Sequence, residues 1–108
     1  MSKYNFTRLK FTYRAKNFLF IKKIYIKDSI GNIIKFELDY FKDIRRKVLD
    51  GGNVEEIIDI LLSVKQIENL NKLFQSSPIT VRFYGKDYYE DYFVKNKEIN
   101  NIIEFLEV

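Results

Sequence analysis

Apolar and polar residues alternate most clearly in residues 18–41. This stretch predicts two strands joined by a polar turn at residues 28–32, and the apolar face of the second strand is Ile34, Phe36, Leu38 and Tyr40. A period of two, interrupted by turn residues, is typical of a half-buried β-hairpin. Residues 4–14 alternate in the same way and predict a further strand with a basic outer face. Because consecutive strands usually pair through short connections, we expect a three-stranded antiparallel meander at the N-terminus.

After residue 40 the apolar residues change to the spacing of a helix. A short helix is predicted over residues 41–49, with Gly51 and Gly52 closing it and the basic triplet at residues 45–47 on its exposed side. Its apolar stripe would be Phe41, Ile44, Val48 and Leu49.

Residues 54–75 predict further helical structure. Asn53 and Glu56 have the spacing of a capping box, and apolar residues recur at helical spacing as far as residue 74. Ser63 and Gln66 also have capping spacing, so this stretch is either one kinked helix or two separate helices.

Residues 79–94 alternate again and predict a second hairpin, with its turn at Gly85 and Lys86. A last helix is expected from Asn96, with the apolar stripe Ile99, Ile102, Ile103 and Leu106. The predicted order is βββ-αα(α)-ββ-α. We therefore expect one α+β domain over residues 1–108, in which an antiparallel sheet (the N-terminal meander plus the C-terminal hairpin) packs against two to four helices.

The composition excludes several kinds of chemistry. The chain has no Cys and no His, so it lacks thiolate chemistry, disulfides and the commonest general base and metal ligand. Asp87, Glu90 and Asp91 lie close in sequence, but their spacing matches no calcium or magnesium loop. No nucleophile–base pair is recognisable. We expect no enzymatic activity, no cofactor and no metal site.

The chain also carries no recognisable membrane or export signal. No apolar run approaches the ~20 residues that span a bilayer, and residues 1–10 lack the apolar core of a signal peptide. We expect a cytoplasmic protein with no membrane partner.

Charge is unevenly distributed along the chain. Residues 1–36 contain nine Lys or Arg and one acid, a net charge of +8, whereas residues 37–108 carry −4, which together give the overall +4. This asymmetry predicts either a basic face for an acidic partner or internal complementarity between the two parts.

The acidic, tyrosine-rich strand near the C-terminus is the leading candidate for a protein contact, because tyrosine is enriched at interfaces. Its residues are Tyr88, Tyr89, Glu90, Asp91 and Tyr92. The abundance of Ile, Lys and Asn is typical of AT-rich genomes. The leading hypothesis is thus a small, non-catalytic, phage- or mobile-element-encoded inhibitor or modulator that occupies a surface of a host nucleic-acid-processing or defence enzyme.

Two alternatives stay open, and so does the oligomeric state. The first is a nucleic-acid-binding accessory protein that uses the basic N-terminal sheet face, with aromatic residues such as Tyr25 stacking on bases. Its basic residues would be Arg8, Lys10, Arg14, Lys22 and Lys23. The second is a structural subunit of a larger assembly. The plain interpretation is a solvated sheet whose lysines discourage pairing with other chains.

Overall fold

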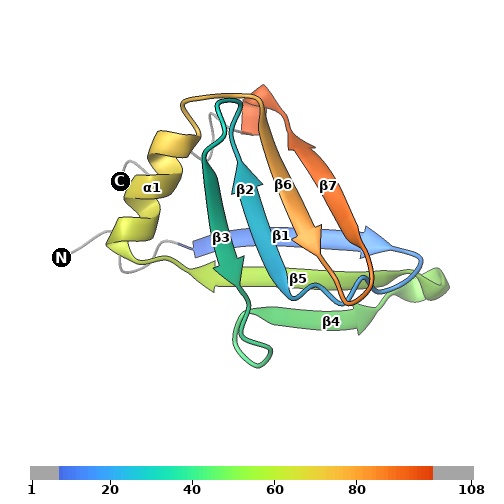
Figure 1. Cartoon of the computed structure of the whole chain (residues 1–108). Helices are drawn as coiled ribbons and strands as arrows, with labels where there is room; N and C mark the ends of the chain where they lie inside the picture. The colour runs from blue at the N-terminus through green and yellow to red at the C-terminus, as the bar shows by residue number, and fades with distance from the viewer. Residues whose placement is uncertain (1–7, 99–108) are drawn as a thin grey trace.

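The computed structural model describes residues 8–98 and contains two antiparallel sheets and one α-helix of ten residues (Figure 1). The three-stranded sheet has the order β1-β5-β4, and the four-stranded sheet has the order β3-β2-β6-β7. The elements in chain order are β1 (Arg8–Ala15), β2 (Lys23–Lys27), β3 (Ile33–Glu37), β4 (Ile44–Val48), a 3₁₀ turn η2 (Asp50–Gly52), β5 (Val54–Leu61), α1 (Val64–Leu73), β6 (Ile79–Tyr84) and β7 (Tyr89–Val94).

The two sheets pack on one another with their strands crossing steeply, and α1 lies beside β3 (Figure 1). The core lies between the two sheets and extends to α1, whose three buried residues all face it. The largest fully buried apolar side chains are Ile21, Ile24, Ile26, Ile58, Ile67, Leu70, Ile79 and Val81. Burying each of these side chains contributes about 1.5–3 kcal/mol relative to leaving it in water.

The expected packing of one sheet against two to four helices is wrong. Among the described residues 47% lie in strands and 18% are helical, and the sheet that faces the four-stranded sheet takes the place of most predicted helices. Residues 44–48 and 54–61 are strands β4 and β5. In β5 the acid Glu56 points into the core and the apolar Ile57 points outward, which hid the period of two and mimicked helical spacing.

The predicted N-terminal meander is also wrong. Strand β1 pairs along its whole length with β5, placing Phe11 opposite Ile58 and Tyr13 opposite Glu56. Residues 16–22 then carry the chain from the three-stranded to the four-stranded sheet. This pairing joins residues 39 to 53 positions apart, so no local turn signal announces it.

Both predicted hairpins are present. Strand β2 pairs with β3, and the Asp28 side chain accepts hydrogen bonds from the backbone N–H groups of Ile30 and Asn32 in their turn. Strand β6 pairs with β7, but through a connection of four residues instead of two.

Of the two helices that one alternative placed in residues 54–75, the one capped by Ser63 forms as α1, whereas residues 54–61 are strand β5. The Ser63 hydroxyl accepts a hydrogen bond from the Gln66 backbone N–H, and the Gln66 side chain accepts one from the Ser63 backbone N–H. Residues 96–98 are helical, whereas the apolar stripe predicted for the last helix lies outside the described residues.

Candidate functional site

The predicted basic residues are divided between the two sheets. Arg8, Lys10 and Arg14 lie on the outer face of the three-stranded sheet, whereas Lys22 directly precedes β2 and Lys23 begins it. Arg8 is 3.4 Å from an oxygen of Asp59, and Arg14 pairs with the buried Glu55. Hydrogen bonds from Arg14, and then from Lys47, lower the pKa of Glu55. Two charges of the predicted patch are therefore offset by neighbouring acids, and the patch is not one surface.

The predicted acidic, tyrosine-rich strand is divided as well. Tyr88 lies in the connection before β7, Tyr89 and Asp91 point away from the core, and Glu90 and Tyr92 point toward β1. Tyr92 donates a hydrogen bond to Glu98 over 2.6 Å. A cavity of about 440 Å³ lies between β1 and β7, and its polar lining includes Lys10, Arg14, Glu90, Asp91 and Tyr92. Residues of the two predicted surfaces thus line one cavity, but no ion pair joins them in residues 8–98.

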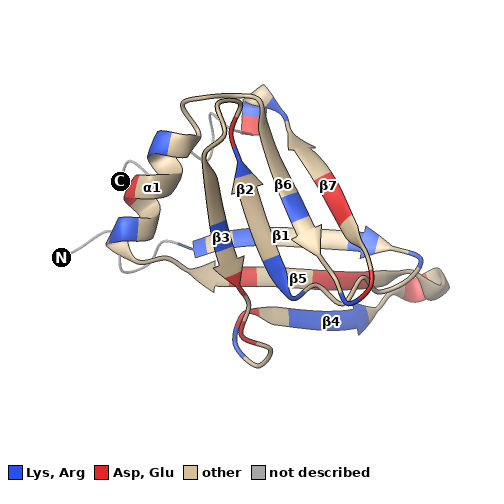
Figure 2. Ribbon diagram, viewed as in Figure 1, with Lys and Arg blue, Asp and Glu red and all other residues tan. Residues whose placement is uncertain are grey.

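The outer face of the four-stranded sheet gathers aromatic and basic side chains. We call this surface the tyrosine face; it consists of Lys23, Tyr25, Lys27, Ile33, Lys35, Glu37, Thr80, Arg82, Tyr84, Tyr89, Asp91 and Phe93. In Figure 1 this sheet lies in front of the three-stranded sheet, and no described helix or strand covers the face turned to the viewer. Figure 2 shows basic residues on β3, β2 and β6 and acidic residues on β7.

Three tyrosine rings on adjacent strands form a row across the tyrosine face. The ring centroid of Tyr84 is 4.7 Å from that of Tyr25 and 6.0 Å from that of Tyr89. The ammonium group of Lys23 lies 5.0 Å from the Tyr84 centroid, and that of Lys35 lies 5.1 Å from the Tyr25 centroid. Cations at these distances are attracted by the ring electrons. The rings and the lysines therefore hold one another in place.

The tyrosine face carries a net positive charge. Arg82 donates hydrogen bonds of 2.7 and 2.9 Å to the two carboxylate oxygens of Asp91, which lowers the pKa of Asp91 and raises that of Arg82. Lys23, Lys27 and Lys35 form no ion pair with any carboxylate in residues 8–98. Their charges are available to a ligand.

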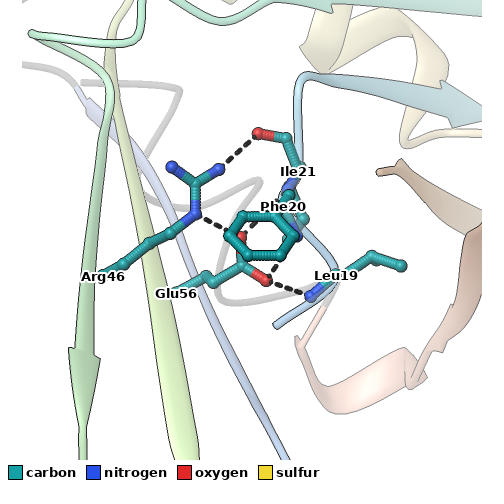
Figure 3. Close-up of polar contacts among 5 residues, drawn as sticks. All are labelled: Leu19, Phe20, Ile21, Arg46 and Glu56. Atoms are coloured by element: carbon teal, nitrogen blue, oxygen red, sulfur yellow. Dashed lines mark hydrogen bonds and ion pairs between the residues drawn. The ribbon is translucent and has the colours of Figure 1, made fainter. Parts of the chain in front are cut away.

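A buried carboxylate on β5 organises a second site, at the beginning of β2 in the four-stranded sheet. Glu56 is 0% exposed and accepts hydrogen bonds from the backbone N–H groups of Leu19 (2.8 Å), Phe20 (3.1 Å) and Ile21 (2.9 Å) (Figure 3). Arg46 donates through Nε to Glu56 over 2.8 Å and through Nη2 to the Ile21 carbonyl over 3.0 Å. Glu56 was predicted to cap a helix and Arg46 to lie on an exposed helix face; both predictions are wrong.

Phe20 is held by this network in a left-handed backbone conformation with φ of +59°. Such a conformation costs about 1–3 kcal/mol for a residue other than glycine, and it is often found at functional sites. The Phe20 ring remains 48% exposed. The Arg46 guanidinium lies 5.5 Å from the Phe20 ring centroid and 5.7 Å from that of Tyr40.

A cavity of about 600 Å³ opens beside Arg46, and we call it the Arg46 pocket. Its walls come from the segment before β2, the end of β3, β4 and the β6–β7 connection: Phe20, Ile21, Lys22, Glu37, Leu38, Tyr40, Ile44, Arg46 and Lys86. The sequence did not reveal this pocket, because its residues are spread over four segments.

No helix among the described residues is long and apolar enough to cross a membrane. Within residues 8–98, no group of three or more acidic side chains is arranged to hold a metal ion. Neither a protein-family model, nor a curated protein, nor a solved structure matches this chain.

Proposed function

We propose that the protein binds single-stranded nucleic acid on the tyrosine face, in the cytoplasm and without catalysis. The observation that carries this proposal is the row formed by Tyr25, Tyr84 and Tyr89 on an uncovered sheet face. Unpaired bases stack on aromatic side chains irrespective of sequence, and neighbouring cations contact the backbone phosphates.

The register of the strands supports a ligand that runs across them. Tyr84 lies directly opposite Tyr89, and Tyr25 lies opposite Arg82, two residues before Tyr84 on β6, so the row crosses the strands obliquely. Neighbouring strands are about 4.8 Å apart, so successive bases of an extended chain can reach successive rings. Lys23 and Lys35 lie at the β2 and β3 side of this row, where they can contact phosphates.

The charge of the face favours a polyanion over a protein surface of mixed charge. Four of its six charged side chains are basic, and the two acids are Glu37 and Asp91. Asp91 forms an ion pair with Arg82. The affinity of a nucleic acid for such a face must fall with salt, since each phosphate contact releases a counterion.

A titration of a labelled single-stranded oligonucleotide at about 50 and 200 mM salt tests this proposal. The variant in which Lys23, Lys27 and Lys35 are changed to Gln should bind more weakly, with the slope of log affinity against log salt reduced by about 2. The matched control changes the exposed Lys16, Lys42 and Lys65 to Gln, which removes the same charge elsewhere. Absence of binding at low salt, or equal losses in both triple variants, would overturn the proposal.

A protein contact is the second candidate, and the exposed aromatic side chains on and before β7 favour it. Tyr89 and Phe93 are exposed on β7, an edge strand of the described sheet, and Tyr88 is exposed in the connection before it. Buried aromatic anchors dominate many interfaces. This candidate retains the hypothesis of an inhibitor of a host enzyme. It predicts that Phe93→Ala abolishes capture of a partner protein while oligonucleotide titrations show no salt-dependent binding.

A further inference from the structure

We propose that the Arg46 pocket binds a nucleoside monophosphate unit, with the base against its aromatic wall and the phosphate at its basic groups. The proposal stands on the pocket and not on the tyrosine face. The pocket volume of about 600 Å³ lies within the range of small-molecule sites, about 300–1,000 Å³.

The aromatic wall of the pocket suits a planar ring. Tyr40 is 69% exposed and Phe20 is 48% exposed, and both line the pocket. The Arg46 guanidinium lies near both rings, which fixes their positions through cation–π attraction. Leu38 and Ile44 complete the apolar lining. A base placed here would replace water over both exposed rings.

The polar groups of the pocket suit a phosphate. A guanidinium has five N–H donors, and Arg46 uses Nε and Nη2 in its two hydrogen bonds within the described chain. Because Glu56 already balances the charge of Arg46, Arg46 supplies directed donors more than net charge. The net charge comes from the exposed Lys22 and Lys86, against the single acid Glu37.

The pocket is built in advance of any ligand. Glu56 binds three successive backbone N–H groups and thereby keeps Phe20 in its left-handed conformation, with the ring at the pocket. Binding to a preformed site avoids the cost of ordering the loop at that moment. The strained Phe20 backbone has a use in this arrangement, since it presents the ring to the ligand.

Titration of the ¹⁵N-labelled full chain with uridine monophosphate tests the pocket directly, with uridine and inorganic phosphate as probes of its two halves. We expect the backbone amide signals of Phe20, Ile21, Leu38 and Arg46 to shift with the monophosphate, and each half alone to bind more weakly. Equal binding of uridine and its monophosphate, or shifts confined to other amides, would overturn the proposal.

Two exposed wall residues provide variants that leave the core intact. Tyr40→Ala should weaken monophosphate binding by about tenfold through lost stacking, and Lys86→Gln should weaken it through the lost charge. The comparison variants are Lys42→Gln and Phe41→Ala. The Phe41 side chain is 91% exposed and lies outside the pocket lining, but its ring meets the Tyr40 ring edge-on with centroids 5.2 Å apart, so Phe41→Ala should cause a smaller loss than Tyr40→Ala. A loss in Phe41→Ala as large as that in Tyr40→Ala would contradict the assignment.

The same chemistry can come from a free nucleotide or from the end of a bound strand. Oligonucleotides with and without a 5′-phosphate separate these sources. If the 5′-phosphate raises oligonucleotide affinity and Tyr40→Ala abolishes that increase, the ligand is a strand end. If the free monophosphate binds and the 5′-phosphate has no effect on oligonucleotide affinity, the ligand is a nucleotide. If oligonucleotides fail to bind while the monophosphate still does, the tyrosine face is contradicted and the pocket is supported.

Discussion

Glu56 and Arg46 form an ion pair in which Oε1 of Glu56 lies 2.8 Å from Nε of Arg46. The Glu56 carboxylate is wholly buried between the two sheets. The carboxylate lies on β5, the guanidinium lies on β4, and their other partners lie in the segment that leads into β2. The pair thus ties the three-stranded sheet to the beginning of the four-stranded sheet. An uncompensated charge in this position would be strongly unfavourable.

Replacing Glu56 by Ala should destabilise the fold by about 3–5 kcal/mol, because it leaves Arg46 and three backbone N–H groups without their acceptor. Urea denaturation followed by circular dichroism measures the change. Glu68→Ala on the exposed side of α1 is the control, with an expected change within about 0.5 kcal/mol. Similar stability of the two variants would show that the Glu56 network contributes little.

Replacing Gly85 by Ala should also destabilise the fold, for a steric reason. A Cβ atom at residue 85 would lie 2.1 Å from the Leu19 carbonyl oxygen, so the β6–β7 connection or the segment before β2 must move. Gly52→Ala is the comparison, because a Cβ atom at residue 52 would have open space around it. That substitution costs only the strain of a positive φ in alanine, about 1–2 kcal/mol. Thermal unfolding should give Gly85→Ala a lower midpoint temperature than Gly52→Ala. The reverse order would contradict the close approach of residue 85 to the Leu19 carbonyl.

The stabilising effect of Asp91 should disappear in acid. Hydrogen bonds from Arg82 lower the pKa of Asp91 in the folded protein. Its contribution to stability is therefore present above the unfolded-state pKa of about 3.9 and is lost as the pH falls through the lower folded-state pKa. Asp91→Asn should be less stable than the parent chain at pH 7, with the difference shrinking below pH of about 4. Asp87→Asn, at an exposed position, should show no such dependence.

The same substitution bears on nucleic-acid binding. Asp91→Asn removes the acid that offsets Arg82 and raises the net charge of the tyrosine face. If phosphates are bound there, oligonucleotide affinity should rise even though the fold becomes less stable. Weaker or unchanged affinity would contradict the electrostatic part of the proposed function.

Tyr84 should contribute most to stacking, because it lies between Tyr25 and Tyr89 in the row. Tyr84→Ala should weaken oligonucleotide binding by about 1–3 kcal/mol, while Tyr84→Phe should keep most of the affinity. Fluorescence anisotropy with a labelled oligonucleotide measures both. An equal loss in the Phe variant would indicate a role of the hydroxyl and not of the ring face.

The elements that the sequence predicted correctly are those whose signals are local. The β2–β3 hairpin combines alternation with a turn closed by Asp28, and α1 begins at a capping box formed by Ser63 and Gln66. Strands β4 and β5 could not be recognised in this way. Their pattern is broken by polar residues that face inward, Glu56 and Arg46, and by Ile57, which faces outward on β5.

The candidate sites were predictable only in part. Lys23 and Tyr25 were recognised as possible nucleic-acid contacts, but Arg82 and Tyr84 join them through the pairing of β2 with β6, which links residues more than 50 positions apart. Likewise, Arg46 was grouped with its neighbours Arg45 and Lys47 as one basic triplet. Only the strand geometry separates Arg46, whose side chain is 18% exposed, from those two outward-facing residues.

The Glu56 network also has a consequence for hydrogen exchange. The amides of Leu19, Phe20 and Ile21 belong to no strand, and amides in such connecting segments ordinarily exchange with solvent through small local openings. Here all three amides donate to the Glu56 carboxylate. Because that carboxylate is buried between the two sheets, these hydrogen bonds break only when the sheets separate. These three amides should therefore exchange as slowly as the centre of β5, which would make an irregular segment a reporter of global unfolding.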